Sequence, residues 1–184
     1  MAIPFSVYEE RARAHGILAS VAFLIIVPLG VLIPRYLRTF SNRWWWAHWL
    51  INLLVAAPLI FAAWAMAKSA RSISHLPTNH HSVGRTIFGL YIVQFLFGAV
   101  IHFVRVPIIL HVGLGLLILT HGGLYHQWEY ATGNVHPVKG SLKHAWLALL
   151  LIFWLMYSIG LVLLRRQFAQ EREGRLLKQD QDGL

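Results

Sequence analysis

Long apolar runs constrain this 184-residue chain more than any other feature of its sequence. Five such runs recur, and each is close to the roughly 20 residues that cross a bilayer as a helix. Hydrophobic residues make up 57% of the chain and charged residues only 12%, which is too apolar a balance for a water-soluble domain. We predict an all-α, polytopic membrane domain over residues 1–164, with spans at about 14–34, 44–66, 80–104, 107–126 and 144–164, and a charged C-terminal tail over 165–184.

The charge of the chain is strongly basic, with 16 Lys and Arg against 7 Asp and Glu and a net charge of +9. In a soluble domain this balance would favour nucleic acid, but here the basic residues flank the spans, where they meet lipid headgroups. We therefore expect a lipid bilayer and no nucleic acid as partner. Arginines adjoining the spans gather on the side that holds residues 35–43 and the tail. The positive-inside rule favours that side as the cytoplasmic one, which would place the N-terminus outside the cytoplasm.

Four histidines stand near the beginnings of successive spans: His15, His48, His80 or its neighbour His81, and His111. Ionisable side chains in a membrane are costly, so each is a functional candidate. Because the spans alternate in direction, the first and third of these histidines lie on one side and the second and fourth on the other. In an up-down bundle these helices face each other diagonally. The sequence thus predicts pair A, His15 with His80, and pair B, His48 with His111.

Two imidazoles at each depth favour a particular ligand. Zinc normally takes three or four ligands around a tetrahedron, and the five spans contain no carboxylate. Two axial imidazoles suit haem iron well. The chain has no cysteine that could attach haem covalently or bind iron as a thiolate. Any one of these histidines alone could instead be a hydrogen-bonded imidazole at the membrane interface. Their recurrence at four span beginnings favours haem.

Small residues follow three of these histidines by one helical turn, on the same helix face: Ala19 after His15, Gly84 after His80 and Gly115 after His111. Such residues would let a flat macrocycle approach the backbone. By the same test His81 is the weaker ligand, because Arg85 lies four residues after it. Polar residues also share the inward faces: Asn52 one turn after His48, and Tyr91 and Gln94 near the middle of the third span.

The other candidates are less specific. His121 is a rival ligand at the depth of pair A, and His102 is expected to bond a cofactor carboxylate or to line a substrate pocket. Haem propionates are anionic and need cationic partners at the membrane surface. The arginines nearest to the predicted ligands are Arg43, Arg85 and Arg105, and binding to lipid headgroups explains each of them equally well.

These residues resemble the cytochrome b561 family, especially the membrane domain that fungal proteins often carry after an extracellular DOMON domain. The matching segments are "AHGILASVAFLIIVPLGVLIPR" around His15, "WWWAHWLINLL" around His48, "HHSVGRTIFGLYIVQFLFGAVIHF" from His80 and "HVGLGLLIL" from His111. Gln94 and Gly98 fall where the family has them. The resemblance covers the chain from about Tyr8 to Leu164.

The resemblance implies a four-helix haem-binding bundle with a fifth transmembrane helix and two haem b groups. It also implies electron transfer across the membrane, from a cytoplasmic reductant to an extracytoplasmic acceptor such as a ferric chelate, a radical or a redox protein. The chain would be an electron carrier or a transmembrane reductase of the ferric or monodehydroascorbate type. Ascorbate-using members often have a lysine just before the second-helix ligand, where Trp46 and Ala47 stand here. Ascorbate is therefore a weaker candidate as donor.

Two other functions are compatible with the sequence. A histidine-lined transporter of protons or metal ions would need no haem, although such pathways usually include an acidic residue and the spans have none. A haem-binding anchor could dock a secreted redox enzyme without passing electrons across. The sequence does not fix the oligomeric state, and a homodimer is compatible with it.

Overall fold

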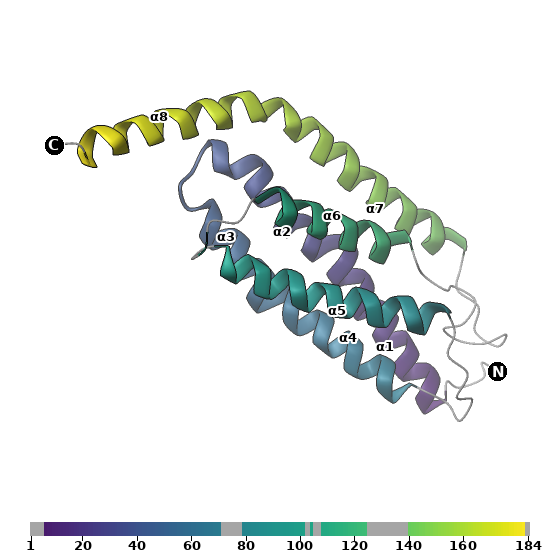
Figure 1. Ribbon diagram of the computed structural model, residues 1–184. Helices are drawn as coiled ribbons and strands as arrows, with labels where there is room; N and C mark the ends of the chain where they lie inside the picture. The colour runs from purple at the N-terminus through teal and green to yellow at the C-terminus, as the bar shows by residue number, and fades with distance from the viewer. Residues whose placement is uncertain (1–5, 71–78, 102–103, 105–107, 125–139, 183–184) are drawn as a thin grey trace.

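The computed structural model describes the chain except for residues 1–5, 71–78, 102–103, 105–107, 125–139 and 183–184 (Figure 1). Within the described residues all regular structure is helical and no strand occurs. The elements in chain order are α1 (Val7–Val21), η1 (Ala22–Ile26), α2 (Val27–Tyr36), η2 (Leu37–Thr39), α3 (Trp44–Leu50), η3 (Ile51–Ala56), α4 (Ala57–Ser69), α5 (Asn79–Val100), α6 (Ile108–Leu124), α7 (Gly140–Ile159), η4 (Gly160–Leu163) and α8 (Leu164–Asp182).

The first membrane helix begins several residues before the predicted span. Ser6 caps α1: its hydroxyl accepts from the Glu9 backbone N–H at 3.3 Å, and the Glu9 carboxylate accepts from the Ser6 N–H at 2.7 Å. This reciprocal capping box satisfies two backbone donors that would otherwise lack partners, and it fixes the helix start at Val7. Elements α1, η1 and α2 then follow one another without a break as one long helix.

Two π-helical segments interrupt the first two long helices at equivalent places. Segment η1 ends two residues before Pro28, and η3 ends two residues before Pro58. Proline has no N–H, and its ring clashes with the carbonyl four residues earlier, so the preceding turn must widen. The backbone N–H of Val27 accordingly donates to the Ala22 carbonyl, five residues back. Both helices therefore accommodate an internal proline in the same way, with a π-helical segment just before it.

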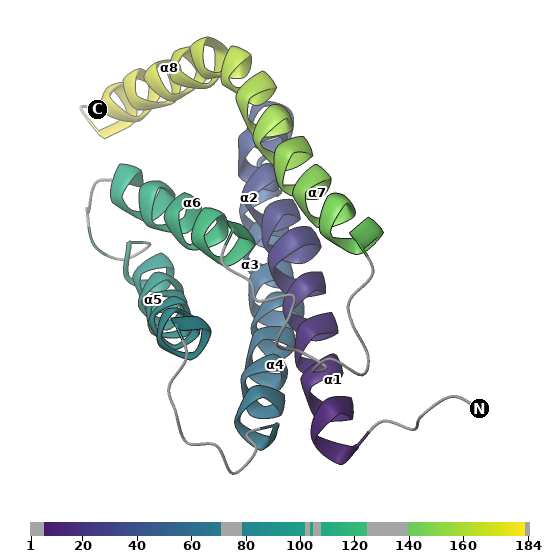
Figure 2. The same cartoon turned by 90° about the vertical axis from the view of Figure 1, so that its right-hand side faces the viewer.

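The first two long helices pack closely and antiparallel. Both helices contain small buried residues, among them Ala22, Ala56, Ala57 and Ala63. Between membrane helices the attraction comes largely from van der Waals packing, so small residues that let backbones approach are favourable. Helix α5 makes its closest helix contact with α6. Figure 2 shows α5 and α6 on one side of this helix pair and α7 on the other.

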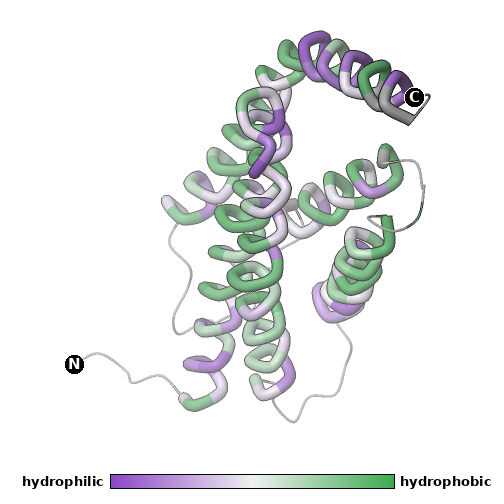
Figure 3. The backbone as a smooth tube through the Cα atoms, turned by 90° about the vertical axis from the view of Figure 1, so that its left-hand side faces the viewer, coloured by the Kyte–Doolittle hydropathy of each residue, from purple (hydrophilic) through white to green (hydrophobic). Residues whose placement is uncertain are grey.

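Among the described residues, four helices are long and apolar enough to cross a membrane, judged by length and composition: Val7–Thr39, Trp44–Ser69, His80–Val100 and Gly140–Gly174. The predicted span at 107–126 corresponds to α6, whose apolar part, Ile109–Gly122, is shorter. Many large apolar side chains face outwards, such as Leu54, which is 62% exposed, and Leu151, which is 60% exposed. Figure 3 shows apolar residues over much of the bundle and a more polar α8. This surface suits a lipid bilayer, so the chain is a multi-pass membrane protein.

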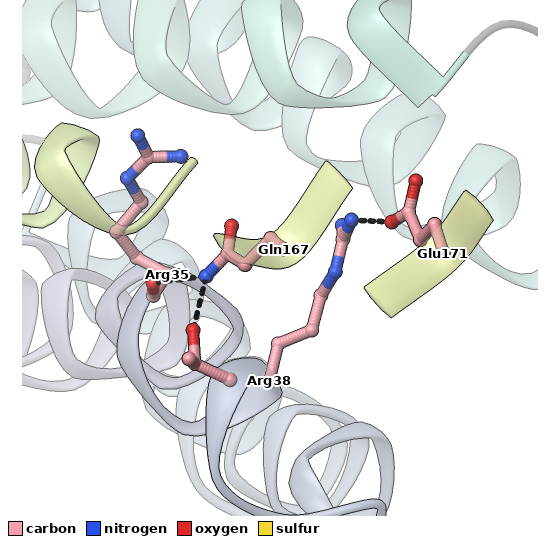
Figure 4. A network of polar contacts seen from close by, with 5 residues as sticks. Arg35, Arg38, Gln167 and Glu171 are labelled. Carbon is pink, nitrogen blue, oxygen red and sulfur yellow. Dashed lines mark hydrogen bonds and ion pairs between the residues drawn. The ribbon is translucent and has the colours of Figure 1, made fainter. Parts of the chain in front are cut away.

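The charged C-terminal tail predicted from the sequence forms helix α8, and the first turns of this helix pack against the bundle. Helix α8 turns away from α7 and contacts η2, next to the end of α2 (Figure 1). The Gln167 amide is buried and donates to the Arg35 carbonyl and to the Thr39 hydroxyl, both at 2.9 Å. Arg38 pairs with Glu171 beside it (Figure 4). These polar contacts dock the first turns of α8 onto the connection between the first two long helices.

Candidate functional site

The structure brings the four predicted histidines together in two pairs. In pair A the ring centres of His15 and His80 are 6.1 Å apart, and the ring planes are inclined at 82°. In pair B the ring centres of His48 and His111 are 6.4 Å apart, and the planes are inclined at 81°. Each pair joins one of the first two long helices to α5 or α6. The pairing of helices one with three and two with four is therefore present in the fold.

The spacing of the rings matches two ligands on opposite sides of one metal ion. An imidazole nitrogen lies about 1 Å from the centre of its ring and bonds a metal at about 2 Å. Two imidazoles facing each other across an ion therefore have ring centres about 6 Å apart. Both pairs have this spacing. Among the described residues, the two pairs included, no group of three or more His, Asp or Glu side chains is placed to hold a metal ion. Two-ligand sites of this kind suit haem iron better than zinc.

Backbone carbonyls orient one imidazole in each pair. The Nδ1 of His15 lies 2.9 Å from the carbonyl oxygen of Ala63, and the Nδ1 of His48 lies 2.7 Å from that of Gly30. A carbonyl can only accept, so Nδ1 must carry the proton in both rings. The other nitrogen, Nε2, then has a free lone pair. This is the usual arrangement of a metal-binding histidine.

Two side-chain amides surround pair B. The Asn52 amide donates to the backbone carbonyl of His48 at 2.7 Å, and the Gln94 amide donates to that of His111 at 2.9 Å. The Gln94 nitrogen also lies 3.4 Å from His111 Nε2. The sequence predicted both amides to face inward. Their contacts link them directly to the two histidines of pair B.

Glycines provide the space that pair B occupies. A Cβ atom at Gly98 would lie 2.9 Å from His111 Cε1, and one at Gly30 would lie 2.6 Å from the Asn52 amide nitrogen. Real Cβ atoms do not approach other atoms so closely, so a larger residue at either position must displace its neighbour. Gly98 and Gly30 are therefore needed for the observed placement of His111 and Asn52.

The two glycines predicted to make room for a macrocycle differ in their surroundings. A Cβ at Gly84, in pair A, would meet nothing within 4 Å, whereas one at Gly115, in pair B, would lie 3.0 Å from the Gln94 amide nitrogen. The space next to the Gly84 Cα is therefore unoccupied by other protein atoms. A macrocycle beside Gly115 would require the Gln94 side chain to move.

Buried polar atoms without partners mark the region around pair B. Within the part of the chain that the structure describes, the His111 Nδ1, the Gln94 Oε1 and the Tyr91 hydroxyl have no hydrogen-bond partner. Such atoms are costly to bury, and they cluster where a ligand or ordered water completes the site. The residues present therefore fit a polar or metal-containing group at pair B.

The remaining predicted residues are less well connected. His80 also packs against His81, with ring centres 6.1 Å apart, so the choice between them as ligand stays a prediction. Arg43 and Arg85 are exposed. Arg105 and His102 lie outside the described residues. His121, the rival ligand, is exposed and lines a cavity of about 220 Å³ between α5 and α6.

Sequence reasoning missed two contributors to the site, the backbone carbonyls of Ala63 and Gly30. Neither has a side-chain signal, because every residue has a backbone oxygen. For Gly30 the sequence did contain one signal, the proline four residues later at position 34.

Comparisons of this chain with protein-family models, with curated proteins and with solved structures find no match. The resemblance to cytochrome b561 proteins thus stays a prediction carried by the histidine motifs. The case for a function has to be made from the geometry of the two pairs.

Proposed function

We propose that this chain is a membrane cytochrome of the b561 type, which binds two haem b groups and carries electrons across a bilayer. The observation that carries the proposal is the presence of two facing histidine pairs, each with ring centres about 6 Å apart. A single pair could be a structural contact between helices. Two pairs with the same ring spacing, contributed by successive helices, are the arrangement that two bis-imidazole haems require.

The depths of the two pairs support transfer across the membrane. His15 lies at the level of Ala63, and Gly30, further along the same long helix, lies at the level of His48. His15 and Gly30 are separated by about 22 Å at 1.5 Å per residue. The hydrocarbon core is about 30 Å thick. The two pairs would therefore divide the crossing between them.

The chain's own residues would hold and insulate the two groups. His15 and His80 would bind one, and His48 and His111 the other. In His15 and His48 the ligand atom would be Nε2, which the carbonyl bonds to Nδ1 leave free. A haem held by two imidazoles supplies reversible one-electron chemistry without an open iron position for oxygen. The buried cluster that includes Ala56, Ile60 and Leu119 excludes water from the bundle interior. Exclusion of water favours electron passage over side reactions there.

We further infer that all five apolar helices cross the membrane, with the N-terminus outside and the tail in the cytoplasm. The basic residues of the η2 connection and of early α8, such as Arg38, Arg43 and Arg165, support this orientation. Pair B would then lie nearer the cytoplasm. It would receive electrons from a cytoplasmic reductant, and pair A would deliver them to an external acceptor such as a ferric chelate, a radical or a redox protein.

The test is an oxidised-minus-reduced absorption spectrum of the detergent-purified chain, with haem and protein quantified on the same sample. Two low-spin haems per chain are expected. A chain without haem would overturn the proposal and would favour transport of protons or metal ions through the histidines. Reconstitution into vesicles with a trapped ferric chelate and an external reductant then tests transfer across the bilayer, with haem-free vesicles as the control.

A further inference from the structure

The Gly30 carbonyl lacks the donor that a regular α-helix would provide. In helix α2 that donor would be the backbone N–H of the residue four positions later, which is Pro34. Proline has no N–H. In the described part of the chain the His48 imidazole is a side-chain donor to this oxygen, which lies 2.7 Å from Nδ1. Pro34 therefore leaves a strong acceptor available on the face of α2 that meets His48.

Pair A is built differently. Its carbonyl belongs to Ala63, and the residue four positions later is Ala67, which has an N–H and lies within helix α4. The His15 imidazole therefore competes with a helical donor for this oxygen, and the contact is longer, at 2.9 Å. Two histidines with the same function would thus have bonds of different strength to the backbone.

The neighbourhood of Gly30 keeps His48 as the partner of this oxygen. The Asn52 amide nitrogen lies 3.4 Å from His48 Nδ1, but it has a closer acceptor in the His48 carbonyl at 2.7 Å. A side chain at position 30 would collide with Asn52, because its Cβ would lie 2.6 Å from the amide nitrogen. Glycine at position 30 and proline at position 34 thus act together on His48.

We propose that Pro34 is a positioning residue for His48: by withholding a helical N–H from the Gly30 carbonyl, it reserves that oxygen for the Nδ1–H of His48 and fixes the tautomer whose Nε2 can bind metal. The proposal deepens the proposed function and rests on it for its consequence at haem. A ligand whose far nitrogen donates a strong hydrogen bond is more basic and favours the oxidised metal. Pro34 would therefore lower the potential of one haem and leave the other unchanged.

The test compares Pro34→Ala with a chain that carries lactic acid at position 34, introduced by nonsense suppression. Both remove the proline ring, but alanine adds a backbone N–H, whereas the lactic acid ester adds none. Alanine in a helix interior is more favourable than proline, so Pro34→Ala should fold. Midpoint potentials of both haems are measured by optical redox titration of the wild type and the two variants.

In Pro34→Ala we expect the binding of ferric haem at one site to weaken about tenfold more than the binding of ferrous haem. For a one-electron couple this equals a rise of about 59 mV in one haem's potential. The ester variant should match the wild type. Unchanged potentials in Pro34→Ala, an equal shift of both haems, or the same shift in the ester variant would each overturn the proposal.

If the purified wild type binds no haem, the proposed function fails and a second readout decides the proposal. The tautomer of His48 is then read by ¹⁵N NMR of histidine-labelled chain, with its signals identified by their absence from His48→Gln. The wild type and the ester variant should have His48 protonated at Nδ1. In Pro34→Ala the ratio of Nδ1-protonated to Nε2-protonated His48 should fall about tenfold. The same tautomer ratio in all three chains would rule out the role of Pro34.

Discussion

Pair A and pair B have the same two imidazoles at nearly the same spacing, but their surroundings differ. Pair B is enclosed by the amides of Asn52 and Gln94 and is pressed against Gly98. Pair A has a helix carbonyl at His15 and open space beside Gly84. The distance between the two rings of each pair follows from helix packing. The polar groups and the free space around each pair follow from the neighbouring side chains. The two sites should therefore bind the same cofactor with different affinities and potentials.

The largest expected effect is the loss of one haem when a ligand is removed. His48→Ala or His111→Ala should reduce the content from two haems to one, because the remaining imidazole of the pair would have to hold the haem alone. His15→Ala and His80→Ala should do the same at the other site. Haem and protein are quantified in each purified variant. The control that should keep two haems is His144→Ala, which changes an exposed histidine of α7. A double variant within one pair should retain one haem, and a double variant across the pairs should retain none.

Gly98→Ala should disturb pair B alone. The new methyl group would lie 2.9 Å from His111 Cε1, so the imidazole must shift. Overpacking of this kind costs about 1–3 kcal/mol, which corresponds to a loss of affinity at pair B of about 5-fold to about 150-fold. Titration of the haem-depleted variant with haem measures this loss. Gly89→Ala, on the same helix and facing open space, is the matched control. Equal losses at both sites would contradict the separation of the pairs.

Gln167→Ala should loosen the end of the bundle nearer pair B. The substitution leaves the Thr39 hydroxyl and the Arg35 carbonyl without their donor, at a cost of about 1–3 kcal/mol. Faster hydrogen exchange in α8 and at the end of α2 is expected, with no change around His15. Glu171→Gln removes only a partly exposed ion pair, worth about 0.2–1 kcal/mol, and is the control. Unchanged exchange in α8 would mean that the docking is not held by Gln167.

Gly84→Ala should have opposite effects with and without cofactor. In the haem-free chain the methyl group meets nothing within 4 Å, and alanine is favoured over glycine in a helix by about 1 kcal/mol. Unfolding of the haem-free chain in detergent should therefore need slightly more denaturant. Haem binding at pair A should weaken if the macrocycle uses this space, as the sequence predicts. Stabilisation in both states would show that the space beside Gly84 is not used.

The sequence predicted the four described helices that are long and apolar enough to cross a membrane, and the histidine pairing, because both depend on simple periodic rules. Apolar length sets where helices lie in a membrane, and alternating direction sorts His15, His48, His80 and His111 into two levels. It did not predict the docking of the tail. Gln167 is one polar residue in a charged segment, and its burial depends on Thr39 and Arg35, about 130 positions earlier in the chain.

The sequence by itself determined which residues could be ligands and at which level each would lie, because helix geometry converts spacing directly into position. Only the tertiary structure decided the neighbours of each imidazole. Gly30 and Ala63 contribute backbone oxygens that every residue has, so their roles follow solely from the antiparallel register of the first two long helices. The sequence does record that Pro34 stands four residues after Gly30. The consequence of this spacing depends on helix packing, which places His48 at the Gly30 carbonyl that proline leaves without a helical donor.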